Sequence, residues 1–226
     1  MILALDTSQS FGSIALQERQ SLVYSAYFDI RITHSETLMP TIDEAFRLCG
    51  YRPNDLSGIV LSIGPGSFTG LRIGLSTAKG MAFALDIPVF TFDSLILGAS
   101  SLIGFERDIF VSLDARMKEL YIAKYSPDLT ELSAPKAVSP QDLLDYDLKD
   151  CIITGSGAKL MKPVMEEAGI TLNYADEAMF FPKAEHLLWL YNNKDTKEHK
   201  GIALMDLAPL YIRESTAQIR ARQKKK

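Results

Sequence analysis

The sequence predicts an α/β fold built from two similar halves, and three observations lead to this prediction. Three β-type segments precede the first helical segment, whereas a Rossmann fold places a helix directly after its first strand. Residues 3–8 (LALDTS) match residues 111–116 (VSLDAR), which puts Asp6 and Asp114 at equivalent places 108 residues apart. Each half also contains an apolar strand that leads into a glycine-rich turn and a helix. Together these features indicate an internal duplication.

Length and composition allow one large domain or two small ones. The chain has 226 residues, of which 47% are apolar, and its formal net charge is −4. That charge argues against a general nucleic-acid-binding protein. The last fourteen residues, however, carry six basic side chains and one acidic one, a net charge of +5. This basic end is either a solvated terminus or a segment that touches RNA or a partner protein, and the sequence leaves both interpretations open.

The cysteines and the hydropathy pattern bear on the cellular compartment. Cys49 and Cys151 are far apart and lack a metal-ligand spacing, so we expect two reduced thiols in or near the core. No basic segment precedes a long apolar one, and no run of about 18 apolar residues occurs. We therefore expect a cytoplasmic protein without a membrane segment.

Secondary structure in the first half follows from β-favouring runs and from apolar residues at helical spacing. The expected strands cover residues 1–6, 13–16, 22–28, 59–63 and 89–92, and the expected helices cover residues 33–49, 71–85 and 95–103. Pro40 removes one helical hydrogen bond, so it predicts a kink or a late start of its helix. Asp93 or Ser94 is expected to cap the third helix.

The second half repeats this order. The expected strands cover residues 109–114, 119–125 and 151–154, a helix is expected to start at 139–142, further helices cover 158–168 and 184–191, and residues 209–213 are extended. We expect one lobe at residues 1–105, a second lobe at 106–213, and a basic, disordered segment at 214–226.

The glycine-rich turn at residues 64–70 (GPGSFTG) has two open interpretations. It either packs tightly, or its backbone amides contact a phosphate or a partner, with Arg72 or Lys79 nearby. It is not a Walker A loop, which requires G-K-[ST] at the helix start. It is not G-x-G-x-x-G either, because Thr69 stands at the third glycine position.

Aspartates at strand ends can hold a hydrated Mg²⁺ or orient a phosphate, but they also bond their own backbone in turns, which we favour slightly here. The candidate anion or nucleotide contacts are Asp6, Thr7, Gly64, Gly66, Ser67, Thr69, Gly70, Asp114 and Arg116. His34, His186 and His199 lack zinc-site spacing, and Thr69 breaks a G-x-S-x-G elbow. We therefore expect no metal site and no catalytic residue.

Five sequence blocks together resemble one family. They are DTS at 6–8, HSETLMPTI at 34–42, GPGSFTGLRIGLSTAKG at 64–80, DARMKELY at 114–121 and PLYIR at 209–213. In order and in coverage of nearly the whole chain, they resemble the TsaB family, also called YeaZ. The resemblance implies two actin-like (ASKHA, RNase H-like) lobes with mixed sheets flanked by helices, in agreement with the internal duplication.

The resemblance implies a bacterial protein that helps to form N6-threonylcarbamoyladenosine at position 37 of tRNAs that read ANN codons. In the family, TsaB is a non-catalytic partner and activator of TsaD, a paralogue that carries the metal and transfers the threonylcarbamoyl group. TsaE, an ATPase, joins that pair, and TsaB alone forms homodimers. Binding of tRNA through the complex, and no cofactor, are implied. The region equivalent to the H-x-x-x-H pair of TsaD, residues 90–100, contains no histidine or cysteine.

The first helix is the expected partner surface, because its apolar residues lie on more than one side. The expected partner-binding residues are His34, Glu36, Leu38, Met39, Ile42, Phe46, Arg72, Leu75 and Lys79. We expect the homodimer and the TsaD pair to use this same surface and to exclude each other.

Two other functions are weighed against this one. A nucleotide-binding actin-like enzyme, such as a small-molecule kinase, would need a D-x-G-[TS] loop, and residues 6–9 are DTSQ. A hydrolase resembling the M22 glycoproteases would need a metal pair or a nucleophile with its base, and the sequence shows neither.

Overall fold

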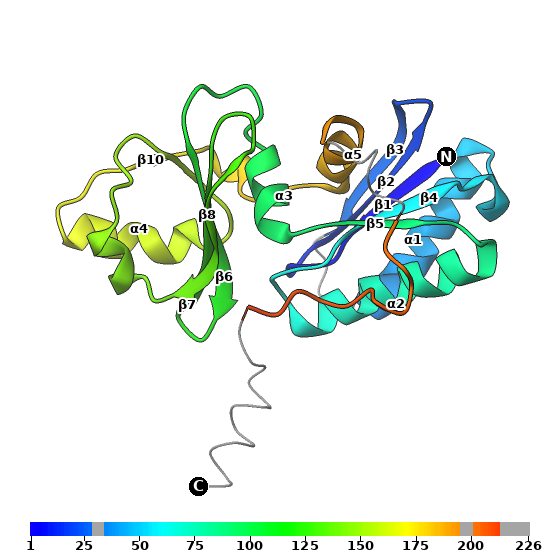
Figure 1. Cartoon of the computed structure of the whole chain (residues 1–226), viewed down its shortest axis with the longest axis horizontal. Coiled ribbons are helices and arrows are strands. Elements are labelled where there is room, and N and C mark those ends of the chain that lie inside the picture. The colour runs from blue at the N-terminus through cyan, green and yellow to red at the C-terminus, as the bar shows by residue number, and fades with distance from the viewer. Residues whose placement is uncertain (29–33, 195–200, 213–226) are drawn as a thin grey trace, which may run out of the picture.

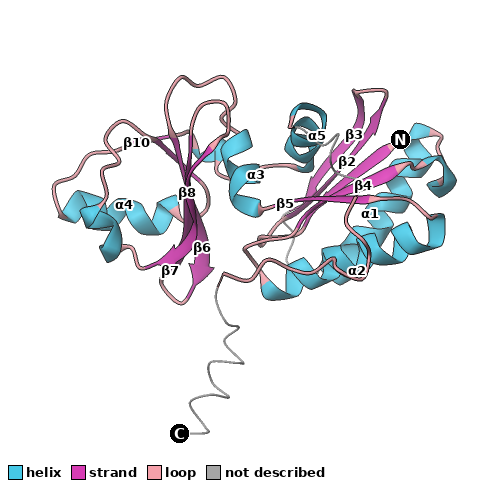
Figure 2. Cartoon of the chain, in the orientation of Figure 1, coloured by secondary structure: helices cyan, strands magenta, loops and turns pink. Residues whose placement is uncertain are grey.

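The computed structural model describes residues 1–28, 34–194 and 201–212, and it folds into two α/β lobes that lie side by side (Figure 1). Each lobe is built on a five-stranded mixed sheet, with strand orders β3-β2-β1-β4-β5 and β10-β9-β6-β7-β8. The helices flank the two strand layers (Figure 2). This architecture confirms the expected α/β fold of two lobes with mixed sheets flanked by helices.

The first sheet consists of β1 (Ile2–Asp6), β2 (Gly12–Glu18), β3 (Ser21–Phe28), β4 (Gly58–Ser62) and β5 (Val89–Phe92). Strand β1 pairs antiparallel with β2 and parallel with β4. Every residue of β4 is buried, as expected for a parallel strand covered on both faces. Strand β3 is an edge strand, and its residues are exposed or half-buried.

Helices cover both faces of the first sheet. Alternate residues of β1 face opposite sides, so that Leu3 and Leu5 pack with α1 (His34–Cys49) and α2 (Phe68–Leu85). Ala4 packs on the other side, against α5 (Ala184–Asn193). The small side chain of Ala4 fits the close approach of α5. Figure 1 shows α1 and α2 on one side of this sheet and α5 on the other.

The second sheet repeats the pairing of the first. Its strands are β6 (Ile109–Arg116), β7 (Glu119–Tyr125), β8 (Glu131–Val138), β9 (Ile152–Thr154) and β10 (Asn173–Tyr174). Strand β6 pairs antiparallel with β7 and parallel with β9, as β1 does with β2 and β4. The remaining elements are α3 (Ser94–Ser100), α4 (Ala158–Glu167) and the 3₁₀ turns η1 (Pro53–Asp55), η2 (Gln141–Asp145) and η3 (Glu177–Met179).

Four details differ from the sequence expectation. Two strands are not predicted from the sequence: β8, in which charged residues and Pro135 interrupt the strand pattern, and the two-residue β10. Helix α1 begins at His34, so Pro40 lies inside it and not before a late start. The expected helix start at 139–142 is the 3₁₀ turn η2.

The C-terminal part of the chain returns to the first lobe. Helix α5 packs against β1 and β2, Ile202 forms a bridge with Val89, and Leu207 is buried in the first core. The amide of Leu210 donates to the carbonyl of Ile63 over 2.8 Å. From the sequence we expect residues 106–213 to form the second lobe, but α5 and residues 201–212 contact the first lobe. The sequence of a short amphipathic helix does not reveal which sheet the helix covers. Residues 213–226 lie outside the described part. No helix within the described part is long and apolar enough to cross a membrane.

Candidate functional site

The two strand-end aspartates adopt the same turn in both lobes. The Oδ1 atom of Asp6 accepts a hydrogen bond from the amide of Ser8 over 3.0 Å, and Oδ1 of Asp114 accepts one from the amide of Arg116 over 2.7 Å. Each carboxylate therefore bonds the backbone two residues further on, which is the turn interpretation of the sequence. The shared geometry also supports the internal duplication.

The glycine-rich turn before α2 packs directly against the loop that follows β1. The amide of Ser67 donates to the carbonyl of Ser8, with an N···O distance of 2.6 Å. A Cβ atom on Gly66 would lie only 2.0 Å from that same carbonyl oxygen. The two backbones can approach this closely only because position 66 has no side chain.

The first turn of α2 is bonded within the chain. Ser67 is its N-cap, and its Oγ accepts from the amide of Gly70 over 3.2 Å. The hydroxyl of Thr7, which is fully buried, donates to the carbonyl of Gly70 over 2.8 Å. A Cβ atom on Gly74 would lie 2.4 Å from this Thr7 hydroxyl oxygen. The amides of Ser67 and Gly70 thus have partners inside the protein, which favours the packing interpretation of the turn.

The remaining candidate anion contacts are placed as follows. Gly64 has a φ of +106°, a left-handed conformation that favours glycine, and its carbonyl accepts from the amide of Ser94 over 2.7 Å. Thr69 is exposed in the first turn of α2. The structure brings the candidate residues of the first lobe together, whereas Asp114 and Arg116 face them from the second lobe.

The second lobe builds an equivalent contact. The amide of Gly157 donates to the carbonyl of Ser112 over 2.8 Å, and a Cβ atom on Gly155 would lie 2.3 Å from that carbonyl oxygen. A glycine-containing turn therefore packs against the backbone of the first strand in the second lobe, and against the loop after the first strand in the first lobe.

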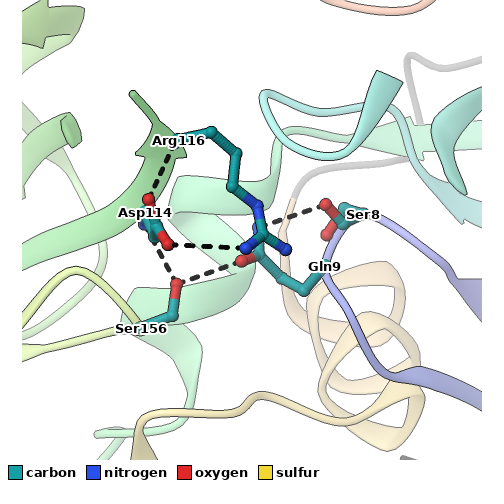
Figure 3. A network of polar contacts seen from close by, with 5 residues as sticks. All are labelled: Ser8, Gln9, Asp114, Arg116 and Ser156. Carbon is teal, nitrogen blue, oxygen red and sulfur yellow. Dashed lines mark hydrogen bonds and ion pairs between the residues drawn. The ribbon is translucent and has the colours of Figure 1, made fainter. Parts of the chain in front are cut away.

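A polar network joins the two lobes where these loops meet (Figure 3). The hydroxyl of Ser156 donates to Oε1 of Gln9 over 3.0 Å and accepts from the amide of Asp114 over 3.1 Å. Nη1 of Arg116 lies 3.9 Å from Oδ2 of Asp114, and Nε2 of Gln9 donates to the carbonyl of Ser8. Neither Gln9 nor Ser156 is among the site residues expected from the sequence. The only available signal was the equivalence of the two glycine-containing turns.

The expected partner surface on α1 and α2 requires a correction. Leu38, Ile42, Phe46 and Leu75 are at most 5% exposed and belong to the core of the first lobe. Helical spacing identifies an apolar face, but it does not distinguish a face packed on the chain's own sheet from one that meets a partner. These four residues are therefore interior in the monomer.

The other expected partner residues lie nearer the surface. Glu36, Met39 and Arg72 are exposed and Lys79 is half-buried, while the side chain of His34 lies outside the described part. The exposed face of α2 consists mainly of small residues beside one large apolar side chain, and we call Ser76, Gly80, Phe83 and Ala84 the α2 outer face. Phe83 is 82% exposed, and no atom of the described part of the chain lies within 4 Å of a Cβ atom placed on Gly80.

The segment at residues 90–100 contains Asp93, which caps α3. Its Oδ1 atom accepts from the amides of Leu95 and Ile96, both over 2.8 Å, and the hydroxyl of Tyr125 also donates to it. Burial raises the pKa of the Asp93 carboxyl. Within residues 1–28, 34–194 and 201–212, no group of three or more His, Cys, Asp and Glu side chains could hold a metal ion.

A family model and two relatives resemble this chain over most of its length. A family model described as "TsaD: tRNA N6-adenosine threonylcarbamoyltransferase" matches residues 30–221. The tRNA threonylcarbamoyladenosine biosynthesis protein TsaB of Bacillus subtilis is 31% identical over 225 residues, which cover 96% of each chain. The TsaB protein of Escherichia coli is 27% identical, also over 96% of each chain.

Solved structures resemble this chain over nearly its whole length. YeaZ from Pseudomonas aeruginosa superposes with a TM-score of 0.79 at 26% identity, covering 93% of this chain and 98% of that one. The ethanolamine utilization protein EutJ of Carboxydothermus hydrogenoformans has a TM-score of 0.51 at 10% identity, a likeness of fold alone. On the family model, the relatives and the solved structures together, the chain belongs to the TsaB (YeaZ) family.

Proposed function

We propose that this chain serves the formation of N6-threonylcarbamoyladenosine in tRNA, as the non-catalytic partner and activator of a TsaD-type transferase in the cytoplasm. The observation that carries the proposal is the likeness to proteins named for this pathway over nearly the whole chain. The match to the transferase family model at residues 30–221 supports a common fold for the chain and its proposed partner.

The α2 outer face supports a role in binding another subunit. A glycine inside an exposed helix is less stable than alanine by roughly 0.5–1 kcal/mol. Among the residues that the structure describes, none approaches Gly80 closely enough to require a glycine there. A second helix that packed closely over Gly80, with Phe83 beside it, would use both the missing Cβ and the exposed ring.

The bonding of the loops supports a non-catalytic role. The amides of Ser67, Gly70 and Gly157 donate to partners within the chain. Backbone amides that stabilise a phosphate or an oxyanion must instead point at the ligand. The proposed division of labour leaves the transfer chemistry to TsaD, with TsaE joining the pair and tRNA bound through the complex.

We further propose that the homodimer and the TsaD-type complex use the same surface. The competition test mixes the homodimer with increasing amounts of the transferase and follows the species by native mass spectrometry. Exclusive use predicts a one-to-one heterodimer that replaces the homodimer. A stable assembly with two copies of this chain still in contact through α2 would contradict the shared surface.

Substitutions on α2 test the partner role. Phe83→Asp and Gly80→Leu should abolish co-purification with the transferase from the same organism and leave the monomer folded. Leu144→Asp is the matched control, because Leu144 is an exposed apolar residue of the second lobe. Retained binding by both α2 variants would contradict the proposed surface.

The enzyme alternatives are tested on the chain alone. A nucleotide-dependent enzyme or a glycoprotease-like hydrolase would hydrolyse ATP or a peptide without any partner. Turnover clearly above that of a heat-inactivated sample would contradict the proposed non-catalytic role.

A further inference from the structure

Residues 7–9, which we call the 7–9 loop, pack on helix α2 without spare room. A Cβ atom on Gly74 would lie 2.4 Å from the hydroxyl oxygen of Thr7. The carbonyl oxygen of Ser8 would lie 2.0 Å from a Cβ atom on Gly66, in the turn that leads into the helix. Because closely packed protein interiors are barely compressible, α2 cannot move toward this loop unless the loop moves with it.

The segment at residues 201–212 holds the first turn of α2 as well. The rings of Phe68 and Tyr211 stack with centroids 5.6 Å apart and an interplanar angle of 28°. Nε of Arg72 donates to the hydroxyl of Tyr211 over 3.3 Å, and the guanidinium carbon of Arg72 lies 3.7 Å from the centroid of the Phe68 ring. The first turn of α2 is thus fixed both to this segment and to the 7–9 loop, so that a displacement of the helix reaches the loop.

The 7–9 loop also contacts the second lobe, through the last of its three residues. Oε1 of Gln9 accepts from the hydroxyl of Ser156 over 3.0 Å, and this hydroxyl in turn accepts from the amide of Asp114 over 3.1 Å. Figure 3 shows the side chain of Gln9 pointing from the first lobe toward Ser156 of the second. We call the Gln9–Ser156 contact the lobe latch.

Helix α3 is the pivot between the lobes, because its two sides belong to different cores. Leu95 and Ala99 pack in the core of the second lobe, whereas Leu97 packs with α5 against the first sheet. The lobe latch is a single hydrogen bond between neutral groups, and such a bond shifts an equilibrium by only about twofold to tenfold. The binding of a partner can supply a shift of this size.

We propose that the 7–9 loop couples the binding of a partner on α2 to the position of the second lobe. A subunit that packs over Gly80 favours one position of α2, and that position favours the closed lobe latch. By linkage, the closed latch raises the affinity for the partner by the same factor by which the partner favours the closed latch. This inference rests on the proposed function for its partner, a TsaD-type transferase, and it makes Gln9 and Ser156 positioning residues.

A simpler role for the lobe latch is to stabilise the fold. That role predicts less stable latch variants with an unchanged affinity for the transferase, because neither Gln9 nor Ser156 belongs to the α2 outer face. Coupling predicts that both substitutions weaken binding at a helix to which neither residue belongs. Their effects must also be non-additive, since each substitution opens the same contact.

The test measures the affinity of the full-length chain for its transferase by isothermal titration calorimetry. The variants are Gln9→Ala, Ser156→Ala and their combination. Gln17→Ala is the matched control, because Gln17 is 5% exposed and its side-chain amide bonds that of Asn192 in α5, which covers the first sheet. Circular dichroism confirms that each variant is folded.

The expected affinities follow from the strength of the latch. Each single substitution should weaken transferase binding by about twofold to tenfold, the range for one hydrogen bond between neutral groups. The double variant should bind no more weakly than the weaker of the two single variants. Gln17→Ala should bind as the wild-type chain does.

Distances between spin labels follow the lobes directly. The labels are attached at Asn54→Cys in the first lobe and Lys149→Cys in the second, both exposed positions, in a chain that also carries Cys49→Ser. The thiol of Cys151 is buried and stays unlabelled. We expect a broader distribution of distances in Gln9→Ala than with the intact latch, and a narrowing of that distribution when the transferase is added.

Three results would overturn the proposal. They are an unchanged transferase affinity in both single variants, additive losses of affinity in the double variant, and a distance distribution in Gln9→Ala that the transferase leaves unchanged. The proposed function survives each of these results if the wild-type chain still binds and activates its transferase. Failure of the wild-type chain to bind the transferase would contradict the proposed function separately.

Discussion

Two alanine substitutions in α2 are expected to change stability in opposite directions. Gly74 and Gly80 lie in the same helix, and both replacements gain the same helix propensity. A Cβ atom on Gly80 meets open space, whereas one on Gly74 would lie 2.4 Å from Oγ1 of Thr7. The difference between the variants therefore isolates the packing of the loop after β1.

The magnitudes follow from these contacts. Gly80→Ala should stabilise the monomer by about 0.5–1 kcal/mol, which raises the unfolding midpoint by about 1–4 °C for a chain of this length. Gly74→Ala gains the same amount but displaces the buried Thr7 hydroxyl from the Gly70 carbonyl or pushes α2 outward. Either change costs about 1–3 kcal/mol, so we expect a net destabilisation of up to about 2.5 kcal/mol.

Thermal and urea unfolding of the two variants measure these changes. In a double-mutant cycle, Thr7→Ala removes the hydroxyl that a Cβ atom on residue 74 would meet. Adding Thr7→Ala to Gly74→Ala should therefore recover about 1 kcal/mol of the stability that Gly74→Ala loses. Thr7→Ser keeps the hydroxyl and is the control without recovery. Stabilisation by Gly74→Ala to the same extent as by Gly80→Ala would refute the packing account of the glycine-rich turn.

Three further predictions concern the partner face, the lobe contact and pH. Gly80→Ala, although it stabilises the monomer, should weaken transferase binding in calorimetric titrations if a second helix packs over position 80, and unchanged affinity would argue against such packing. Gln9→Ala removes the acceptor of the Ser156 hydroxyl between the lobes. We expect a loss of about 1 kcal/mol in the free energy of unfolding in urea and wider distances between the lobes in spin-label measurements. The control Gln17→Ala, which removes the contact with Asn192, should lower the free energy of unfolding without changing the distances between the lobes. Burial lowers the pKa of His186, whose Nδ1 accepts from the amide of Lys183. Since the unfolded chain binds that proton more readily, the stability from His186 is present above pH of about 6.5 and is lost as pH falls. His186→Asn should remove this part of the pH dependence, and parallel stability curves for both proteins would contradict it.

Local patterns were sufficient for most of the fold. The buried runs of β1 and β4 and the glycines before α2 have strong sequence signals, and the match of Asp6 with Asp114 indicates two lobes from the sequence alone. The sequence does not predict β8, because half of its residues are exposed and Pro135 and two charged residues interrupt the strand pattern, so that its pairing with β7 decides its conformation. Tertiary contacts override weak local preference in such edge strands.

The candidate site was less predictable, because its parts meet through the fold. The Gln9–Ser156 contact joins residues 147 apart, and neither side chain belongs to a recognisable motif. From the sequence we expect Leu38 and Phe46 to contact a partner, but both side chains lie in the core of the first lobe. Periodicity shows which side of a helix is apolar, but it does not show whether that side packs on the chain's own sheet or on another protein. Tyr211 lies in an irregular segment whose position beside Phe68 no local pattern indicates.

Reconstitution of the modification tests the proposed function most directly. The reaction combines the TsaD-type transferase, the TsaE-type ATPase, the synthase that makes threonylcarbamoyl-adenylate, ATP, threonine, bicarbonate and unmodified tRNA, with or without this chain. Mass spectrometry of the digested tRNA then quantifies the modified adenosine. We predict formation of the modified base only when this chain is present, and a loss with the Phe83→Asp variant but not with Leu144→Asp. Equal yields with and without the chain would contradict its role as the activating partner.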